Sequence, residues 1–299
     1  MIKPLIERGL VAGLAVVAVT AFAEAESSTV VSAIASDILD DAKSNADRET
    51  LIANHAEKSA ALIAKMAEGI GADSKEEYRR IPWIWRVAIA AGKRNDAAEM
   101  KQILDVSLPK ESQPLADWQA VVVGGGIING LTHAGQWPEK RVAEILKGSP
   151  AIEARWRTSL EQASKMADND PTPTGSRYDS LRMIAMEGWK KRGDQLTRYL
   201  KKGTHAELQM GAVSGTADVP EAGATVALIE HLAGLEPENL KLAVEGLQRT
   251  EDRQLALLQA IREGRAQTKL LGDEGAKALK ESKSEKVRKT ANEVLKSGA

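Results

Sequence analysis

A helical pattern that occurs twice between residues 205 and 264 limits the possible fold more than any other feature of this sequence. Leu208-Gln-Met-Gly-Ala-Val213 is followed 32 residues later by Leu240-Lys-Leu-Ala-Val-Glu245, so the same apolar spacing returns. Helix breakers at Val219-Pro220-Glu221 and Gly234-Leu-Glu-Pro237 are each followed by a new amphipathic run. A repeat of this length is typical of stacked helical hairpins.

The composition favours an all-α fold for the whole chain. Hydrophobic residues make up 43% of the sequence and aromatic residues only 3%. Small and unbranched apolar residues favour helices, whereas a β-sandwich would need more valine, tyrosine and phenylalanine. We expect an α-solenoid of about six helical hairpins, whose uneven spacing is more typical of HEAT repeats than of the strictly periodic tetratricopeptide or ankyrin repeats.

Apolar residues at spacings of three and four predict the individual helices. One helix is predicted from about Thr50 to Ile70, a second from Tyr78 to Ala91 with Pro82 near its beginning, and a third within Leu115 to His133. The last helix, from Ser284 to Leu295, has few apolar residues among many lysines and glutamates. A polar outer face of this kind is typical of a terminal capping repeat.

The first 25 residues are typical of an export signal. Lys3 and Arg8 give a positive start before an apolar run from Leu10 to Phe22. Ala23-Glu24-Ala25 fits the small-x-small rule for cleavage, with a cut after Ala23 as the alternative. The run is shorter than the roughly 20 residues that cross a bilayer, which favours a cleaved signal peptide over a membrane anchor. We therefore expect a periplasmic or cell-envelope protein with no other membrane segment.

The predicted domain organisation is simple. It consists of a signal peptide (1–25) followed by one HEAT-like solenoid (26–299), with the clearest repeats at 204–264 and the capping end at 280–299.

Charge and residue counts exclude several functional classes. Lysine and arginine total 41 against 42 acidic residues, so there is no basic excess to indicate nucleic-acid binding. The chain contains no cysteine, which leaves packing rather than disulfides to stabilise an exported protein. No two of the four histidines (His55, His133, His205 and His231) have the i, i+4 spacing of a helical metal site. We expect no metal and no cofactor.

The glycine-rich run from Val121 to Gly130 has two interpretations. A dinucleotide-binding loop needs the pattern Gly-x-Gly-x-x-Gly after a strand, but when Gly124 and Gly126 start the pattern the third position is Asn129. Each glycine inside a helix costs about 1 kcal/mol relative to alanine. The glycines therefore indicate either a close helix crossing or a break that exposes backbone amides, and the second possibility makes the run a candidate contact for a partner or ligand.

Two other motifs are incomplete. Oxygen-bearing residues stand at the spacings of a calcium loop, but Pro173 replaces the required glycine and the bidentate glutamate is missing, so we interpret the segment as a solvated loop. The residues concerned are Asp168, Asp170, Thr172, Thr174 and Asp179. Ser214 stands one place away from the nucleophile position of Gly-x-Ser-x-Gly, so the sequence predicts no enzyme.

Most of the six tryptophans are expected to fill the core beside small alanines, and the others are candidates for a binding surface. Trp83 and Trp85 lie about 200° apart around a helix, so they do not both face one core. Indole side chains are frequent anchors of protein interfaces. The predicted partner-binding residues are Trp83, Trp85, Trp118, Gly124, Gly125, Gly126, Asn129 and His133.

Three stretches, 78–92, 117–131 and 177–185, carry a resemblance to a known family. They resemble the HEAT-like segment of large secreted proteins of planctomycete-type bacteria, in which the segment lies between a sugar-dehydrogenase-type β-propeller and a c-type haem domain. Without a Cys-x-x-Cys-His motif or room for a propeller, only the scaffold part of that resemblance applies here. The repeats and the tryptophans predict a non-enzymatic exported scaffold that binds a protein partner on its concave face, lined by the second helix of each hairpin. The resemblance implies that this partner is a propeller or cytochrome c module. The alternative is a small-molecule-binding protein or enzyme that uses the Gly124 to His133 region.

Overall fold

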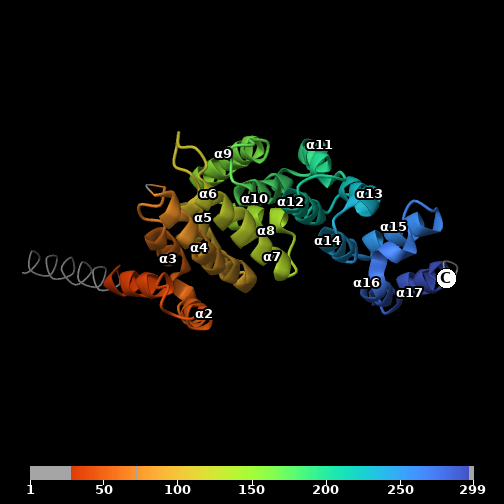
Figure 1. The fold of residues 1–299 in the computed structure, drawn as a ribbon, viewed down its shortest axis with the longest axis horizontal. Helices are drawn as coiled ribbons and strands as arrows, with labels where there is room; N and C mark the ends of the chain where they lie inside the picture. The colour runs from red at the N-terminus through yellow and green to blue at the C-terminus, as the bar shows by residue number, and fades with distance from the viewer. Residues whose placement is uncertain (1–27, 72, 296–299) are drawn as a thin grey trace, which may run out of the picture.

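The computed structural model describes residues 28–71 and 73–295, and these residues form helices and turns with no strand (Figure 1). The predicted all-α fold is confirmed. The predicted signal peptide, residues 1–25, lies outside the described residues. Among the helices of the described chain, none combines the length and the apolar character needed to cross a membrane.

The helices follow one another through short turns. A helix over residues 28–38 is followed by α2 (Asn45–Asn54), α3 (Ser59–Met66), α4 (Ser74–Arg94), α5 (Ala97–Ser107), α6 (Asp117–Ala120), the π-helix η2 (Val121–Ile128), α7 (Asn129–His133), α8 (Pro138–Leu146), α9 (Pro150–Ala167), α10 (Thr174–Ile184), α11 (Trp189–Leu200), α12 (Ala206–Ala217), α13 (Ala222–His231), α14 (Pro237–Leu247), α15 (Glu251–Arg262), α16 (Gly272–Lys280) and α17 (Glu285–Val294). Short 3₁₀ turns are η1 (Ala56–Lys58), η3 (Ala185–Glu187), η4 (Leu232–Gly234) and η5 (Thr268–Leu271).

Most helices lie in two rows along an elongated molecule (Figure 1). In what we call the first row, α4 packs against the continuous segment α6–η2–α7, which packs against α10, followed by α12 and α14. The second row contains α3, α5 and α8, and later α11, α13, α15 and α17. The two repeats of the sequence are neighbours in the first row, since Leu208 lies in α12 and Leu240 in α14.

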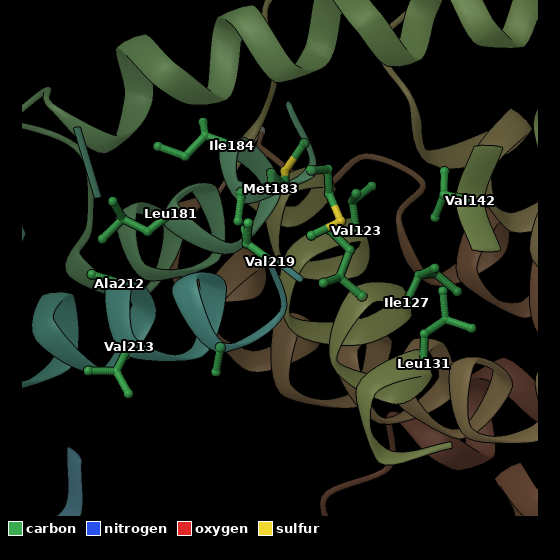
Figure 2. Close-up of a cluster of buried hydrophobic side chains, with 14 of the residues drawn as sticks. Val123, Ile127, Leu131, Val142, Leu181, Met183, Ile184, Ala212, Val213 and Val219 are labelled. Atoms are coloured by element: carbon green, nitrogen blue, oxygen red, sulfur yellow. The ribbon is translucent and has the colours of Figure 1, made fainter. Parts of the chain in front are cut away.

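An apolar layer fills the space around the first row. Val123, Ile127 and Leu131, at helical spacing on η2 and α7, are buried, as are Leu181 of α10 and Val142 of α8 (Figure 2). The spacing of these residues in the sequence therefore selects the side of each helix that faces the core.

Helix α4 begins earlier than the sequence analysis predicts. The side chain of Asp73 accepts a hydrogen bond from the amide of Lys75 and caps the helix at Ser74, so Pro82 lies in the helix interior and not near its start. The prediction of Tyr78 as the beginning of this helix was wrong because the apolar spacing misses a polar first turn. Pro82 has no amide hydrogen, so the carbonyl of Tyr78 lacks its usual i+4 donor.

The helix predicted over residues 50–70 is also wrong, since the chain bends after Asn54 and starts α3 at Ser59. A distant residue stabilises this bend. Arg94, at the end of α4, donates hydrogen bonds to the Ala56 carbonyl (3.3 Å) and to Ser59 Oγ (2.9 Å). By contrast, α17 begins as expected at the Ser284 cap, although its role as a capping repeat stays a prediction.

Candidate functional site

The first row has a face that the second row does not cover. On α4 its residues recur at helical spacing, and further along the row α7, α10 and α12 contribute polar and apolar side chains. We define the first-row face by its exposed and partly exposed residues, which are Tyr78, Pro82, Trp85, Ile89, Asn129, Tyr178, Met210 and Ser214. Trp85 and Asn129 are two of the predicted partner-binding residues.

Glycines allow the helices under this face to approach closely. A Cβ on Gly124 would lie 2.2 Å from the carbonyl oxygen of Asp179 in α10, and a Cβ on Gly126 would lie 2.3 Å from the Cβ of Ala88 in α4. The glycine run therefore packs closely against α10 on one side and against α4 on the other. It is helical throughout, so it does not form the strand and loop of a dinucleotide site. Nor is it a break with exposed amides, because Gly124, Gly125 and Gly126 are buried against helices of the same chain.

The two neighbouring tryptophans of α4 have different surroundings, as their 200° separation predicts. Trp83 is buried, with the guanidinium of Arg48 3.9 Å from its ring centroid. Trp85 is partly exposed, and its Nε1 donates a 2.9 Å hydrogen bond to the Gly125 carbonyl. Trp118 is partly buried against the core. Partner contact by the accessible residues of the predicted set stays a prediction.

Polar side chains converge at the carboxyl-terminal ends of the first-row helices. Buried Asp218, just after α12, accepts hydrogen bonds from Arg182 Nη2 (3.1 Å) and Arg249 Nη1 (2.7 Å). Thr132 Oγ1 lies 2.8 Å from both carboxylate oxygens, and Arg182 also donates to Asn129 Oδ1 (3.0 Å). We call these five residues the Asp218 cluster. It connects α7, α10 and the end of α12 with Arg249, the second residue after the end of α14.

Positive charge exceeds negative charge around this cluster. The guanidinium groups of Arg249 and Arg253 lie 4.1 Å and 5.1 Å from the ring centroid of Trp137, and Arg253 also donates to the carbonyls of Ala217 and Gly246. Burial and the neighbouring Arg249 lower the pKa of Arg253 to about 10. Burial alone would lower the pKa of Arg182 as well, but Tyr178 and Asp218 raise it.

The Asp218 cluster serves the packing of the first row. Both oxygens of Asp218 already accept hydrogen bonds, and Asn129 already accepts from Arg182. His133, at the end of α7, remains accessible to solvent. The neighbouring helices still remove part of the water around its imidazole, and this desolvation, together with the charges of Lys93 and Arg182, lowers the pKa of His133. The sequence analysis identified Asn129 but missed Arg182 and Asp218. The available signals were an arginine within the otherwise apolar stretch from Leu181 to Met186 and an aspartate before a helix break.

Asp179 is a titratable residue outside the Asp218 cluster, at the crossing of η2 and α10. It is buried, and its Oδ1 has no hydrogen-bond partner. Burial raises the pKa of Asp179 well above its ordinary value, and Glu207 adds to the rise while Arg182 opposes it. Because burial disfavours the charged form more than Arg182 stabilises it, the carboxyl keeps its proton over a wider pH range in the native state than in the unfolded chain.

The raised pKa predicts a pH-dependent effect of Asp179→Asn. An unfolded aspartate ionises near pH 4, whereas native Asp179 retains its proton to higher pH. The native state therefore binds more protons above about pH 4, and the free energy of unfolding falls as pH rises towards the native pKa. Asparagine does not ionise, so we expect the variant to gain stability relative to the wild type as pH rises. Urea unfolding of both proteins across the pH range measures this gain, with exposed Asp252→Asn as the control. Parallel pH curves for Asp179→Asn and wild type would contradict the prediction.

A groove lies at the opposite, amino-terminal ends of the first-row helices. We call it the amino-end groove, a cavity of about 250 Å³ where the starts of α4, α6 and α10 meet. Its walls are mostly apolar and include two carboxylates, Glu77 and Asp117. The lining residues are Ser74, Glu77, Tyr78, Ile81, Pro82, Asp117, Val121, Pro173, Gly175 and Ser176.

In the loop that resembles a calcium site, two of the three acidic side chains are in other interactions, and the third, Asp179, is buried at the crossing of η2 and α10. Asp168 accepts from Arg198 and Tyr199, and Asp170 pairs with Arg177. Within residues 28–71 and 73–295, no group of three or more histidine, aspartate and glutamate side chains is placed to hold a metal ion.

The fold and the two sites define an all-helical protein with a close-packed row of helices, a buried polar cluster at one edge of that row and a groove at the other. No protein-family model matches the chain, and neither the curated proteins nor the solved structures contain a match to it.

Proposed function

We propose that this chain is an exported, non-enzymatic α-solenoid scaffold of HEAT-like hairpins that binds a protein partner on the first-row face. The main support is the continuity of that face over four successive members of one helix row, from Trp85 to Ser214. Close glycine crossings and the Asp218 cluster hold these helices at fixed positions. A preorganised surface loses little conformational entropy on binding, which favours a scaffold.

The class of partner follows from the family resemblance alone. A secreted protein with a β-propeller or a c-type haem domain is the partner that this resemblance implies. Export is proposed from the pattern of residues 1–25. In this proposal the chain has no cofactor of its own, and it positions a redox module that another protein supplies.

The second candidate function is small-molecule binding near Asn129 and His133. The accessible imidazole of His133, whose pKa is lowered, favours it, since a neutral imidazole both donates and accepts hydrogen bonds. The bond that Asn129 already accepts from Arg182 weighs against it, because a ligand would have to replace that bond. We therefore prefer the protein scaffold.

Paired surface variants test the scaffold. The tagged chain is crosslinked in the exported fraction of its own cells, and retained proteins are identified by mass spectrometry. We expect Ile89→Glu/Met210→Glu, which places two charges on the first-row face, to reduce capture of the partner at least about tenfold, a loss of about 1.4 kcal/mol. The control Val106→Glu/Val226→Glu adds the same charge at exposed positions of α5 and α13 in the second row and should capture normally.

Three outcomes of this experiment would contradict the proposal. Equal loss of partner capture with both pairs of substitutions would show that the first-row face is not the binding surface. If the wild-type chain captures no protein, the scaffold function is contradicted and small-molecule binding becomes the preferred function. Absence of the chain from the exported fraction would contradict the proposed export.

A further inference from the structure

The amino-end groove has the composition of a site for a positively charged side chain with an apolar stem. Glu77 lines it from α4 and Asp117 from α6, and both carboxylates are only partly exposed. None of the ten described lining residues is lysine, arginine or histidine. Two negative charges therefore share this cavity without a cation among the residues that form it.

Burial disfavours the charged forms of both carboxylates. The amino-terminal end of a helix normally stabilises a carboxylate and lowers its pKa. Here burial raises the pKa of Glu77, with a further contribution from Asp117, and burial also raises the pKa of Asp117 despite its hydrogen bond with Ser176. A cation in the groove would offset the cost of burying both charges.

The surroundings of the carboxylates suit the remainder of a long cationic side chain. Ile81, Pro82 and Val121 supply apolar walls against which methylene groups can pack. Tyr78, at the same groove, is 73% exposed, and an aromatic ring beside a cation adds a favourable interaction. The carbonyl of Tyr78, which lacks an i+4 donor because of Pro82, is a further acceptor in this region.

We propose that the amino-end groove binds a lysine or arginine side chain of the protein partner. This inference rests on the proposed function, because it specifies the chemistry of the partner that lies along the first-row face. Tyr78 and Pro82 belong both to the groove and to that face, so one extended segment of the partner reaches both. The recognised segment is basic, and its long side chain enters the groove with the ammonium or guanidinium group between the two carboxylates.

Peptide binding tests this inference without knowledge of the partner. The probe is a fluorescein-labelled, acetylated decapeptide of alternating alanine and lysine, with an alanine–glutamate peptide as the negative control, and binding to the full chain is followed by fluorescence anisotropy at low salt. We expect Glu77→Gln/Asp117→Asn to raise the Kd of the lysine peptide at least about tenfold. The matched control Glu251→Gln/Asp252→Asn removes two exposed acids from the first turn of α15 and should change the Kd less than about twofold.

Photocrosslinking adds a second measurement that does not depend on substituting the carboxylates. A benzophenone amino acid in place of Tyr78 should crosslink to the lysine peptide, and the same amino acid in place of exposed Val226 on α13 should not. Equal weakening by the two pairs of acid substitutions would assign the binding to overall charge and overturn the inference. So would equal binding of the lysine and glutamate peptides. If the lysine peptide does not bind while the partner is still captured through Ile89 and Met210, only the assignment of the groove as a cation site is wrong. If the lysine peptide binds and no partner is captured, the proposed scaffold function is wrong instead.

Discussion

Replacing Asp218 by asparagine should lower the free energy of unfolding by about 3–5 kcal/mol, because it removes one charge of a buried ion cluster. Arg182 is buried and Arg249 is largely buried, and both donate to this carboxylate. Without it, the two guanidinium groups would remain in a low-dielectric environment with only neutral acceptors. Urea unfolding followed by circular dichroism measures the loss from the shift in midpoint at constant m-value.

Two controls separate loss of the charge pair from a general effect of substitution. The exposed Asp252→Asn should change stability by less than about 0.5 kcal/mol. The double variant Arg182→Met/Asp218→Leu should lose less unfolding free energy than Asp218→Asn alone, because it removes one buried positive and one buried negative charge together. A loss below about 1 kcal/mol for Asp218→Asn would show that the cluster does not hold the first row together.

Replacing Gly124 by alanine should destabilise the chain by about 1–3 kcal/mol or more, through overpacking of the crossing between η2 and α10. Alanine elsewhere in a helix gains about 1 kcal/mol over glycine. At this position the new methyl group would lie 2.2 Å from the Asp179 carbonyl oxygen, and a backbone atom has no alternative rotamer. The helices would have to separate to admit it.

Gly175→Ala is a matched control for the same substitution. Gly175 lies in the first turn of α10, and the nearest atom to an added Cβ is the flexible carboxylate oxygen of Glu207, at 3.5 Å. We expect this variant to be neutral or to gain up to about 1 kcal/mol in unfolding free energy. Comparable losses at Gly124 and Gly175 in thermal or urea unfolding would contradict the close-crossing explanation.

Local patterns predict the helices well where the chain supplies both an apolar spacing and a terminal signal. Ser284 caps α17 at the predicted position, and Pro220 and Pro237 separate the helices of the repeat as expected. The prediction fails where a distant side chain changes the local geometry. The bend after Asn54 depends on Arg94, which lies 35 residues beyond Ser59 in the sequence.

The candidate sites were much less predictable than the helices. The glycine run had two interpretations because the cost of glycine in a helix is the same for a crossing and for a break. Only the positions of α4 and α10 on either side of Gly124 and Gly126 distinguish them. Likewise, the 200° separation of Trp83 and Trp85 predicts that they face different surroundings, but it does not say which ring is buried.

Residues three or four positions apart are enough to predict that this protein is helical, where most of its helices turn and which side of each helix is apolar. Which polar residues meet depends instead on how the helices pack. Thr132 and Asp218 are 86 residues apart, yet they share a hydrogen bond, and Glu77 and Asp117 share a groove across two helices. Contacts of this kind depend on the order and spacing of the packed rows, and no local pattern specifies them.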